Sequence, residues 1–367
     1  MSEFIQLHML VSYPPSNLNR DDLGRPKTAM MGGAQRLRIS SQSLKRAWRT
    51  SDIFSDALAG HLGIRTKEIG TLVYQSLTSG VGLSEIIKGT KDVSATFQPV
   101  PEEKARKWAS EIAGTFGKLK KGDDALEIEQ LAHFSPEEIG AIGALVEKLA
   151  ATGSDPDEND KKLLVERHTA ADIAMFGRML AASPAYNTEA AVQVSHAVTV
   201  HAVAVEDDYF TAVDDLNRGD EDMGAGHLGE TEFASGLFYL YACINRDLLC
   251  ENLGDDEALT AASLRALVEA ATKVAPTGKQ NSFASRAYAS YLLAERGCQQ
   301  PRSLSVAFLK PLQDADLLGS AIRALKETRD RMDAVYGKCS DAWCDMDAHA
   351  GEGTLQGVLD FVAGQHA

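Results

Sequence analysis

The uneven distribution of helical and strand-like segments constrains the fold of this chain more than any other feature of its sequence. Residues 4–11 alternate in polarity and predict a half-buried strand whose polar face carries Gln6 and His8. From about residue 55 to residue 165, alanine-rich amphipathic segments alternate with charged turns, a pattern typical of helices. After Arg167, segments rich in valine and aromatic residues follow. A long helical block therefore separates two strand-forming parts of the chain.

The later segments complete this outline. Strands are predicted at 169–180, 191–205, 233–245, 286–293 and 303–309, and a helix is predicted from Asp314 to Val335. Helices and strands are mixed without regular alternation, which favours an α+β fold over a doubly wound sheet. We expect the first strand and the C-terminal strands to share one sheet, with the helical block inserted as a separate lobe.

Composition indicates a globular protein in a reducing compartment. The hydrophobic share of 44% and the charged share of 24% are ordinary for soluble domains. No apolar run approaches the roughly 18 residues that a membrane span needs, and the first residues lack the basic region of a signal peptide. The five cysteines include no C-x-x-C pair. We expect a cytoplasmic protein without a membrane partner, and no sequence motif indicates a metal or cofactor.

Positive charge is concentrated in residues 19–50, although the chain as a whole is acidic. This stretch holds eight Lys or Arg and two acids, a formal charge of +6, whereas the whole chain carries −15 and the remainder therefore −21. Screening confines the effect of charge to roughly 8–10 Å. The stretch is therefore a candidate anion-binding surface, even though the global charge argues weakly against nucleic acid.

Residues 40–49, near the end of the basic stretch, predict a helix that is capped by Ser40 or Ser41. Its polar stripe consists of Gln42, Lys45, Arg46 and Arg49, and its apolar face consists of Leu44, Ala47 and Trp48. Cations beside a helix N-terminus form a track for phosphates. In the preceding extended segment Arg36 and Arg38 point the same way, and two glycines would let a sugar-phosphate chain approach the backbone. A solvated basic face paired with the protein's own acids is the alternative.

Several motifs in this sequence resemble those of one known family. They are LNRDD at 18–22, GG-x-x-R-x-R-I-S-S-Q-S-L-K-R-A at 32–47, GRM at 177–179, FTAVDDL at 210–216, HLG-x-x-EF-x-SG-x-FY at 227–239, ENLG at 251–254 and GKQNSFA at 278–284. In their order and spacing they resemble CasC, the backbone subunit of Cascade, the type I-E CRISPR surveillance complex. The likeness covers nearly the whole chain, and the helical block and the C-terminus match only loosely.

The resemblance implies an RRM-like, ferredoxin-like palm with an inserted helical fingers lobe and a β-hairpin thumb. The palm would comprise residues 1–53, 166–196 and 227–367, the fingers 54–165 and the thumb 197–226. It also implies a non-catalytic protein that polymerises along the spacer of a CRISPR RNA into a helical filament. Its partners would be the CRISPR RNA, target DNA through the guide, further copies of itself and other Cascade subunits, in antiviral defence.

The basic motifs and the resemblance together predict the RNA-binding residues. They are Asn19, Arg20, Lys27, Gly32, Gly33, Arg36, Arg38, Ser40, Gln42, Lys45, Arg46, Arg49, Met179, Lys279, Gln280, Ser282 and Arg286. Because spacer sequences vary, such a subunit must hold the phosphate backbone and leave the base edges free. Met179 is equally compatible with a core position, and the last four residues are equally compatible with an ordinary polar surface.

The resemblance places a thumb wedge at Tyr209, Phe210 and Thr211, with the two aromatic residues between nucleotides. Core packing is the alternative for these aromatics. A rival function is a metal-dependent nuclease that cuts target RNA, as in backbone subunits of type III complexes, with Asp21 or Asp22 as the catalytic residue. The sequence around these aspartates lacks the carboxylates and histidines that would hold a metal, and an aspartate here can simply cap a turn.

Overall fold

The computed structural model describes residues 2–122, 125–165, 168–212 and 227–364. The chain divides into two compact units. The first comprises Met1–Ala57, Val192–Asp247 and Ala261–Ala367, and the second comprises Leu58–Ala191 and Leu248–Thr260. Residues 166–191 were expected in the palm, but those that are described cluster with the helical residues of the second unit.

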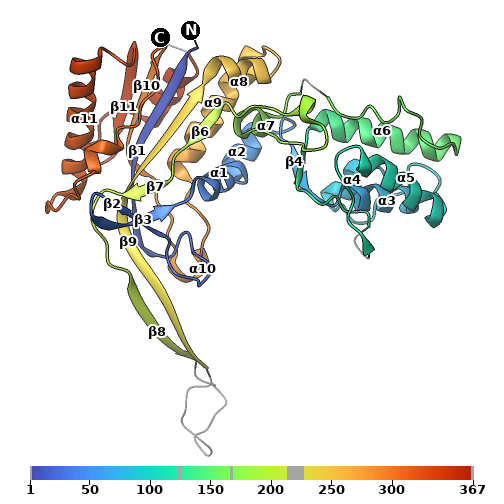
Figure 1. Cartoon of the computed structure of the whole chain (residues 1–367), viewed down its shortest axis with the longest axis horizontal. Coiled ribbons are helices and arrows are strands. Elements are labelled where there is room, and N and C mark those ends of the chain that lie inside the picture. Colours follow the sequence, from blue (N-terminus) through green and yellow to red (C-terminus); the bar gives the residue numbers. More distant parts are fainter. Residues whose placement is uncertain (1, 123–124, 166–167, 213–226, 365–367) are drawn as a thin grey trace, which may run out of the picture. The chain divides into compact units, whose positions relative to one another are not determined.

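An antiparallel sheet forms the centre of the first unit, which confirms the mixed α+β class (Figure 1). Its strands are β1 (Phe4–Ser16), β2 (Thr28–Met31), β3 (Ala34–Ile39), β6 (Val192–Val194), β7 (Ala197–Thr199), β8 (Glu206–Ala212), β9 (His227–Asn245), β10 (Ala289–Gly297) and β11 (Ala342–Asp347). The order is β11-β10-β1-β9-β7-β3-β2, and β6 and β8 also pair with β9. The N-terminal strand thus lies between strands from the second half of the chain, as the sequence predicts.

Strand β1 is buried on both faces, so the prediction of a half-buried strand is wrong. Gln6 is 2% exposed and His8 is fully buried. The cause is tertiary, because elements that follow much later in the sequence cover the polar face. Leu10 of β1 shares a core with Phe308 and Leu325, which belong to η3 (Ser305–Phe308) and α11 (Leu317–Tyr336).

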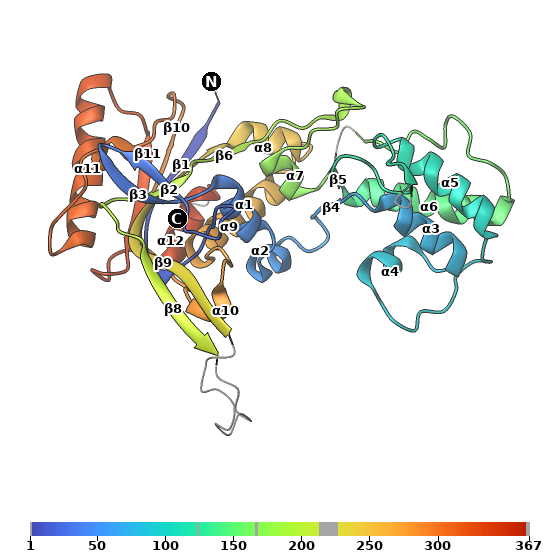
Figure 2. The same ribbon diagram turned by 60° about the horizontal axis from the view of Figure 1, so that its bottom comes forward.

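The remaining helices of the first unit frame this sheet. They are α1 (Ser41–Arg49), α2 (Asp52–Ala57), α10 (Gln280–Phe283) and α12 (Leu355–Val362); α8 (Arg246–Asn252) and α9 (Glu257–Lys273) cross the boundary between the units. Figures 1 and 2 show α11 on one side of the sheet and α1 with α9 on the other. The predicted helix 314–335 is confirmed, whereas the strand predicted at 303–309 is wrong, since η3 occupies it.

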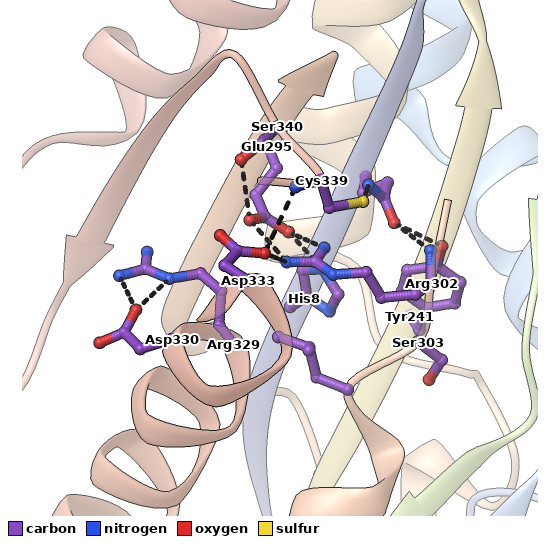
Figure 3. Close-up of polar contacts among 12 residues, drawn as sticks. His8, Tyr241, Glu295, Arg302, Ser303, Arg329, Asp330, Asp333, Cys339 and Ser340 are labelled. Atoms are coloured by element: carbon purple, nitrogen blue, oxygen red, sulfur yellow. Dashed lines mark hydrogen bonds and ion pairs between the residues drawn. The ribbon is translucent and has the colours of Figure 1, made fainter. Parts of the chain in front are cut away.

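A buried polar network holds the C-terminal segments to this sheet (Figure 3). Glu295 of β10 lies 3.2 Å from Nε2 of His8 and accepts hydrogen bonds from Arg302 and Ser340. Burial raises the pKa of the Glu295 carboxyl, but the hydrogen bonds from His8 and Arg302 outweigh it and hold this pKa at about 2. Burial lowers the pKa of His8, which suits a neutral ring between Glu295 and the Tyr239 hydroxyl.

The second unit is mainly helical. It contains α3 (Ile69–Ser79), α4 (Leu83–Lys88), α5 (Glu102–Gly114), α6 (Pro136–Thr152), α7 (Ala171–Phe176), η2 (Pro184–Tyr186) and a small hairpin of β4 (Ile64–Thr66) with β5 (Ala132–Phe134). Trp108, Phe134 and Ile142 lie in its core. The strand predicted at 169–180 is wrong: α7 occupies its middle and is buried almost all round, so its apolar run carries no helical period.

Strand β8 and the start of β9 extend from the sheet of the first unit as a two-stranded ribbon (Figure 1). The pairing runs from Glu206 opposite Phe233 to Ala212 opposite His227. This ribbon occupies part of the predicted thumb, 197–226. Residues 197–199 of that prediction form β7, which pairs with β9 and β3, and residues 213–226 lie outside the described residues.

Candidate nucleic-acid interface

The basic helix α1 forms as its sequence pattern predicts. The Ser40 side chain caps it by accepting a hydrogen bond from the backbone N–H of Ser43 over 3.3 Å. Leu44, Ala47 and Trp48 are buried. On the opposite face Gln42 and Arg46 are exposed, while Lys45 and Arg49 are partly exposed. Burial lowers the pKa of Lys45 below its ordinary value.

A loop anchored by Asn19 and Asp21 lies beside this helix. Oδ1 of Asn19 accepts a hydrogen bond from the Ser40 N–H over 2.8 Å, so the side chain predicted to bind RNA already braces the start of α1. Oδ1 of Asp21 accepts from the N–H groups of Leu23 and Arg25, each over 2.9 Å. Asp21 therefore caps a turn, which is the structural alternative considered for it above.

An open cleft of about 530 Å³ runs between this loop, the helix and a distant segment of the chain. Its lining comprises Leu18, Asn19, Arg20, Asp21, Asp22, Gly24, Ser43, Arg46, Ala47, Thr50, Thr277 and Gly278. Gly278 fits only because it lacks a side chain, since a Cβ there would lie 2.2 Å from the carbonyl oxygen of Leu18. The structure thus joins the two basic motifs, which are far apart in the sequence.

Three cleft residues with polar side chains, Ser43, Thr50 and Thr277, escaped the sequence-based predictions. Ser43 and Thr50 lie on the same helical stripe as Arg46, at spacings of three and four residues, so the periodicity contained the signal for both. Thr277 precedes the GKQNSFA motif, and only the fold brings it to the cleft.

The second basic motif turns partly toward the ribbon. Nζ of Lys279 lies 2.6 Å from the Thr231 hydroxyl, and the Phe283 and Phe233 ring centroids are 6.1 Å apart. Oε1 of the Gln280 side chain accepts a hydrogen bond from the Ser285 hydroxyl, and its buried Nε2 has no partner among the described residues. Ser282 and Arg286 are exposed. Of the four predicted residues, these last two are the accessible ones.

Arg36 requires a correction, because it is fully buried and turns inward. Its guanidinium donates to the carbonyl oxygens of Thr199 over 2.8 Å and of Phe308 over 3.0 Å. Buried donors satisfied by protein carbonyls cannot also hold phosphate. Arg38, two residues along the same strand, is partly exposed, and its Nη1 lies 3.2 Å from Nδ1 of His196. Lys27, which directly precedes β2, is also partly exposed.

The glycine pair serves a tight turn between β2 and β3. Gly32 and Gly33 have φ angles of +60° and +75°. A two-residue hairpin loop with a type I′ turn requires positive φ at both of its residues. A Cβ at Gly32 would lie 1.6 Å from the carbonyl oxygen of Leu309, so the close approach that this glycine allows is to protein. Gly33 faces open space, which leaves it available to a ligand.

The two wedge aromatics lie on different faces of the ribbon, because neighbouring residues of a strand point in opposite directions. The Phe210 ring covers Gly229 on the paired strand, where a Cβ would lie 2.2 Å from the ring Cζ. Tyr209 is 65% exposed and Phe210 is 44% exposed, and Thr211 is exposed as well. Tyr209 is therefore the freer aromatic surface, and neither ring is a core residue.

In the second unit Met179 is 77% exposed, so the core alternative for this residue is wrong. It lines a hollow of about 280 Å³ together with Lys118, Leu131 and neighbouring residues of the same unit. A flexible thioether in the open suits contact with a varied apolar surface such as a base.

Two negative findings concern the residues that the structure describes. Within them, no group of three or more His, Cys, Asp and Glu is arranged to hold a metal ion. None of their helices combines the length and apolar character that a membrane span requires.

Comparison with known proteins adds information to this geometry. The family model described as CT1975-like protein matches residues 5–358. No curated protein matches the chain. Among solved structures, a chain of a "CRISPR RNA-guided surveillance complex, pre-nicking" is 27% identical with a TM-score of 0.80, and the alignment covers 99% of this chain and 100% of that one. A chain of a second "CRISPR RNA-guided surveillance complex", 24% identical with a TM-score of 0.59, shares the fold over 99% of this chain and 100% of its own. Since the family model spans nearly the whole sequence, the protein belongs to the CT1975-like family.

Proposed function

We propose that this protein is the CRISPR RNA-binding backbone subunit of a Cascade-type surveillance complex. The observation that carries the proposal is the cleft in which two distant basic motifs meet, on a chain that matches a surveillance-complex subunit from end to end. The cations that line the cleft or adjoin it on α1 are suited to phosphate, which gives affinity and position without reading sequence. The motif pattern supports the finer assignment to CasC of type I-E and to an RRM-like palm.

In this proposal several copies polymerise along one spacer and present segments of the guide for pairing with target DNA. Arg20, Arg46 and the exposed polar residues of α1 hold the guide backbone, and Lys27, Arg38 and Arg286 extend the contact surface. Arg36 and Asn19 support this surface from within the protein. The ribbon, which carries Tyr209, acts as the thumb between nucleotides. The protein works in the cytoplasm and itself performs no catalysis.

Copurification tests the proposal directly. The full-length protein expressed with a CRISPR RNA should elute as a large species whose A260/A280 ratio exceeds that of protein alone. Expression without the guide should yield smaller, RNA-poor material. A protein that stays small and free of nucleic acid in both cases would refute the assignment.

The nuclease alternative is tested with the same material. Incubation with guide or target and Mg²⁺ or Mn²⁺ should leave both strands intact, because the described residues around Asp21 and Asp22 include no group of three or more His, Cys, Asp and Glu that could hold a metal ion. Metal-dependent cleavage that disappears in Asp22→Ala would establish the rival function instead.

A further inference from the structure

The cleft contains one group that a phosphate-binding surface does not need. Asp22 lines it and is exposed, and no hydrogen bond or ion pair engages its carboxylate within the part of the chain that the structure describes. Its neighbour Asp21 differs, because Oδ1 of its carboxylate accepts hydrogen bonds from two backbone N–H groups, those of Leu23 and Arg25. The side chains of Arg20 and Arg46, which line the same cleft, likewise lack such a partner among the described residues. The cleft therefore offers two available cations and, at Asp22, a carboxylate with neither oxygen engaged by the described residues.

The chemistry of a nucleic-acid backbone decides what this carboxylate can bind. An ionised carboxylate only accepts hydrogen bonds, and phosphate oxygens are also acceptors and negatively charged. A DNA backbone therefore offers Asp22 no favourable contact. An RNA backbone offers one donor per nucleotide, the ribose 2′-hydroxyl. Base edges also carry donors, but they vary with the spacer and cannot serve a subunit that holds every guide alike.

We propose that Asp22 selects RNA over DNA by accepting a hydrogen bond from a ribose 2′-hydroxyl of the strand in this cleft. This inference rests on the proposed function. Arg20 and Arg46 attract the phosphates of either nucleic acid, and Asp22 repels both. Only RNA offsets the repulsion, by forming a charge-assisted hydrogen bond. Specificity is a difference between two affinities, and because the repulsion is common to both strands, Asp22 contributes to that difference through the hydrogen bond that only RNA donates.

Replacing the ribose 2′-hydroxyl of the ligand with fluorine isolates this contact. The probes are an unstructured RNA of spacer length, the same strand with 2′-fluoro sugars, which keep the RNA-like pucker but cannot donate, and the DNA of that sequence. The full-length wild-type protein should bind RNA about tenfold more tightly than 2′-fluoro RNA, the value expected for one hydrogen bond to a charged group. Asp22→Ala should bind these two strands almost equally and should bind DNA more tightly than the wild type does.

Two further variants, and the preference of the wild-type protein itself, serve as controls for this test. Asp22→Asn keeps an acceptor oxygen without the charge and should retain part of the preference. Asp314→Ala removes an exposed acid that does not line the cleft and should leave the preference unchanged. If Asp22→Ala keeps the full preference for RNA over 2′-fluoro RNA, or if the wild type has none, the inference is overturned while the proposed function stands. A wild-type protein that binds no RNA would instead overturn the proposed function itself.

Discussion

The cleft beside α1 and the β8–β9 ribbon differ in the charge and apolar surface that they would present to the proposed ligand. The cleft concentrates cations on a helix whose other face is buried. The ribbon consists of one pair of strands and carries Glu206, Asp207 and Asp208 next to two exposed aromatic residues. The first region suits phosphate, while the second repels it and offers flat apolar surface to bases. Under the proposed function, the cleft would fix position along the strand, and the ribbon would act between its bases.

The two regions are nevertheless fastened to each other at the base of the ribbon. Arg25 of the cleft loop lies 3.1 Å from the Glu232 carboxylate on β9, and Nδ2 of Asn17 donates to the Glu232 carbonyl oxygen over 2.9 Å. On the other side Lys279 meets Thr231 of the same strand. These contacts connect the cleft loop and the second basic motif to the base of the ribbon, so the following substitutions test the two regions one at a time.

The largest expected effect comes from removing the buried guanidinium that ties β3 to β7 and η3. Arg36→Met leaves the carbonyl oxygens of Thr199 and Phe308 without their donor, which should lower the free energy of unfolding by about 2–4 kcal/mol. Chemical denaturation measures this loss. Arg38→Met, the matched change two residues along β3, should cost far less because its side chain is partly exposed. Equal losses in the two variants would contradict the structural role of Arg36.

The next largest effect should come from removing positive charge from α1, which leaves the ribbon unchanged. Replacing Lys45, Arg46 and Arg49 together with Ala should weaken binding of every guide alike, because phosphate contacts carry no sequence information. If each cation contacts one phosphate, the log–log salt dependence of single-strand binding should flatten by about 2. Titrations at several salt concentrations measure the slope. A loss confined to particular spacer sequences would show that α1 reads bases.

The smallest effect on affinity should come from the ribbon, where Tyr209→Ala removes an exposed ring. Base stacking on an aromatic contributes about 1–3 kcal/mol per base, and acidic neighbours exclude phosphate from this site. Guide binding should therefore keep its salt slope, while the periodic unpaired position in the guide–target duplex should become less distinct in chemical probing. Phe210→Ala serves as the comparison, since that ring is partly engaged over Gly229. Uniform protection of all spacer bases in the wild type would exclude the thumb role.

The contrast between correct and incorrect predictions follows from the range of the interactions involved. Helix α1, its Ser40 cap and its buried face were predictable because cap and period are local properties of ten residues. The strand at 233–245 and the helix near 314–335 were predictable for the same reason. The continuous apolar run in α7 was not, because an element buried on all sides carries no period that distinguishes helix from strand.

The sequence by itself determined which helix would present cations, and the family resemblance indicated where the exposed aromatics would lie. Only the tertiary structure decided which of these groups are free to bind. Arg36 and Arg38 are equivalent in the sequence pattern, yet η3 and β7 cover one and leave the other accessible. The cleft itself depends on Gly278 meeting Leu18 across more than half the chain. Burial is set by what packs against a residue, and that partner is encoded elsewhere in the sequence.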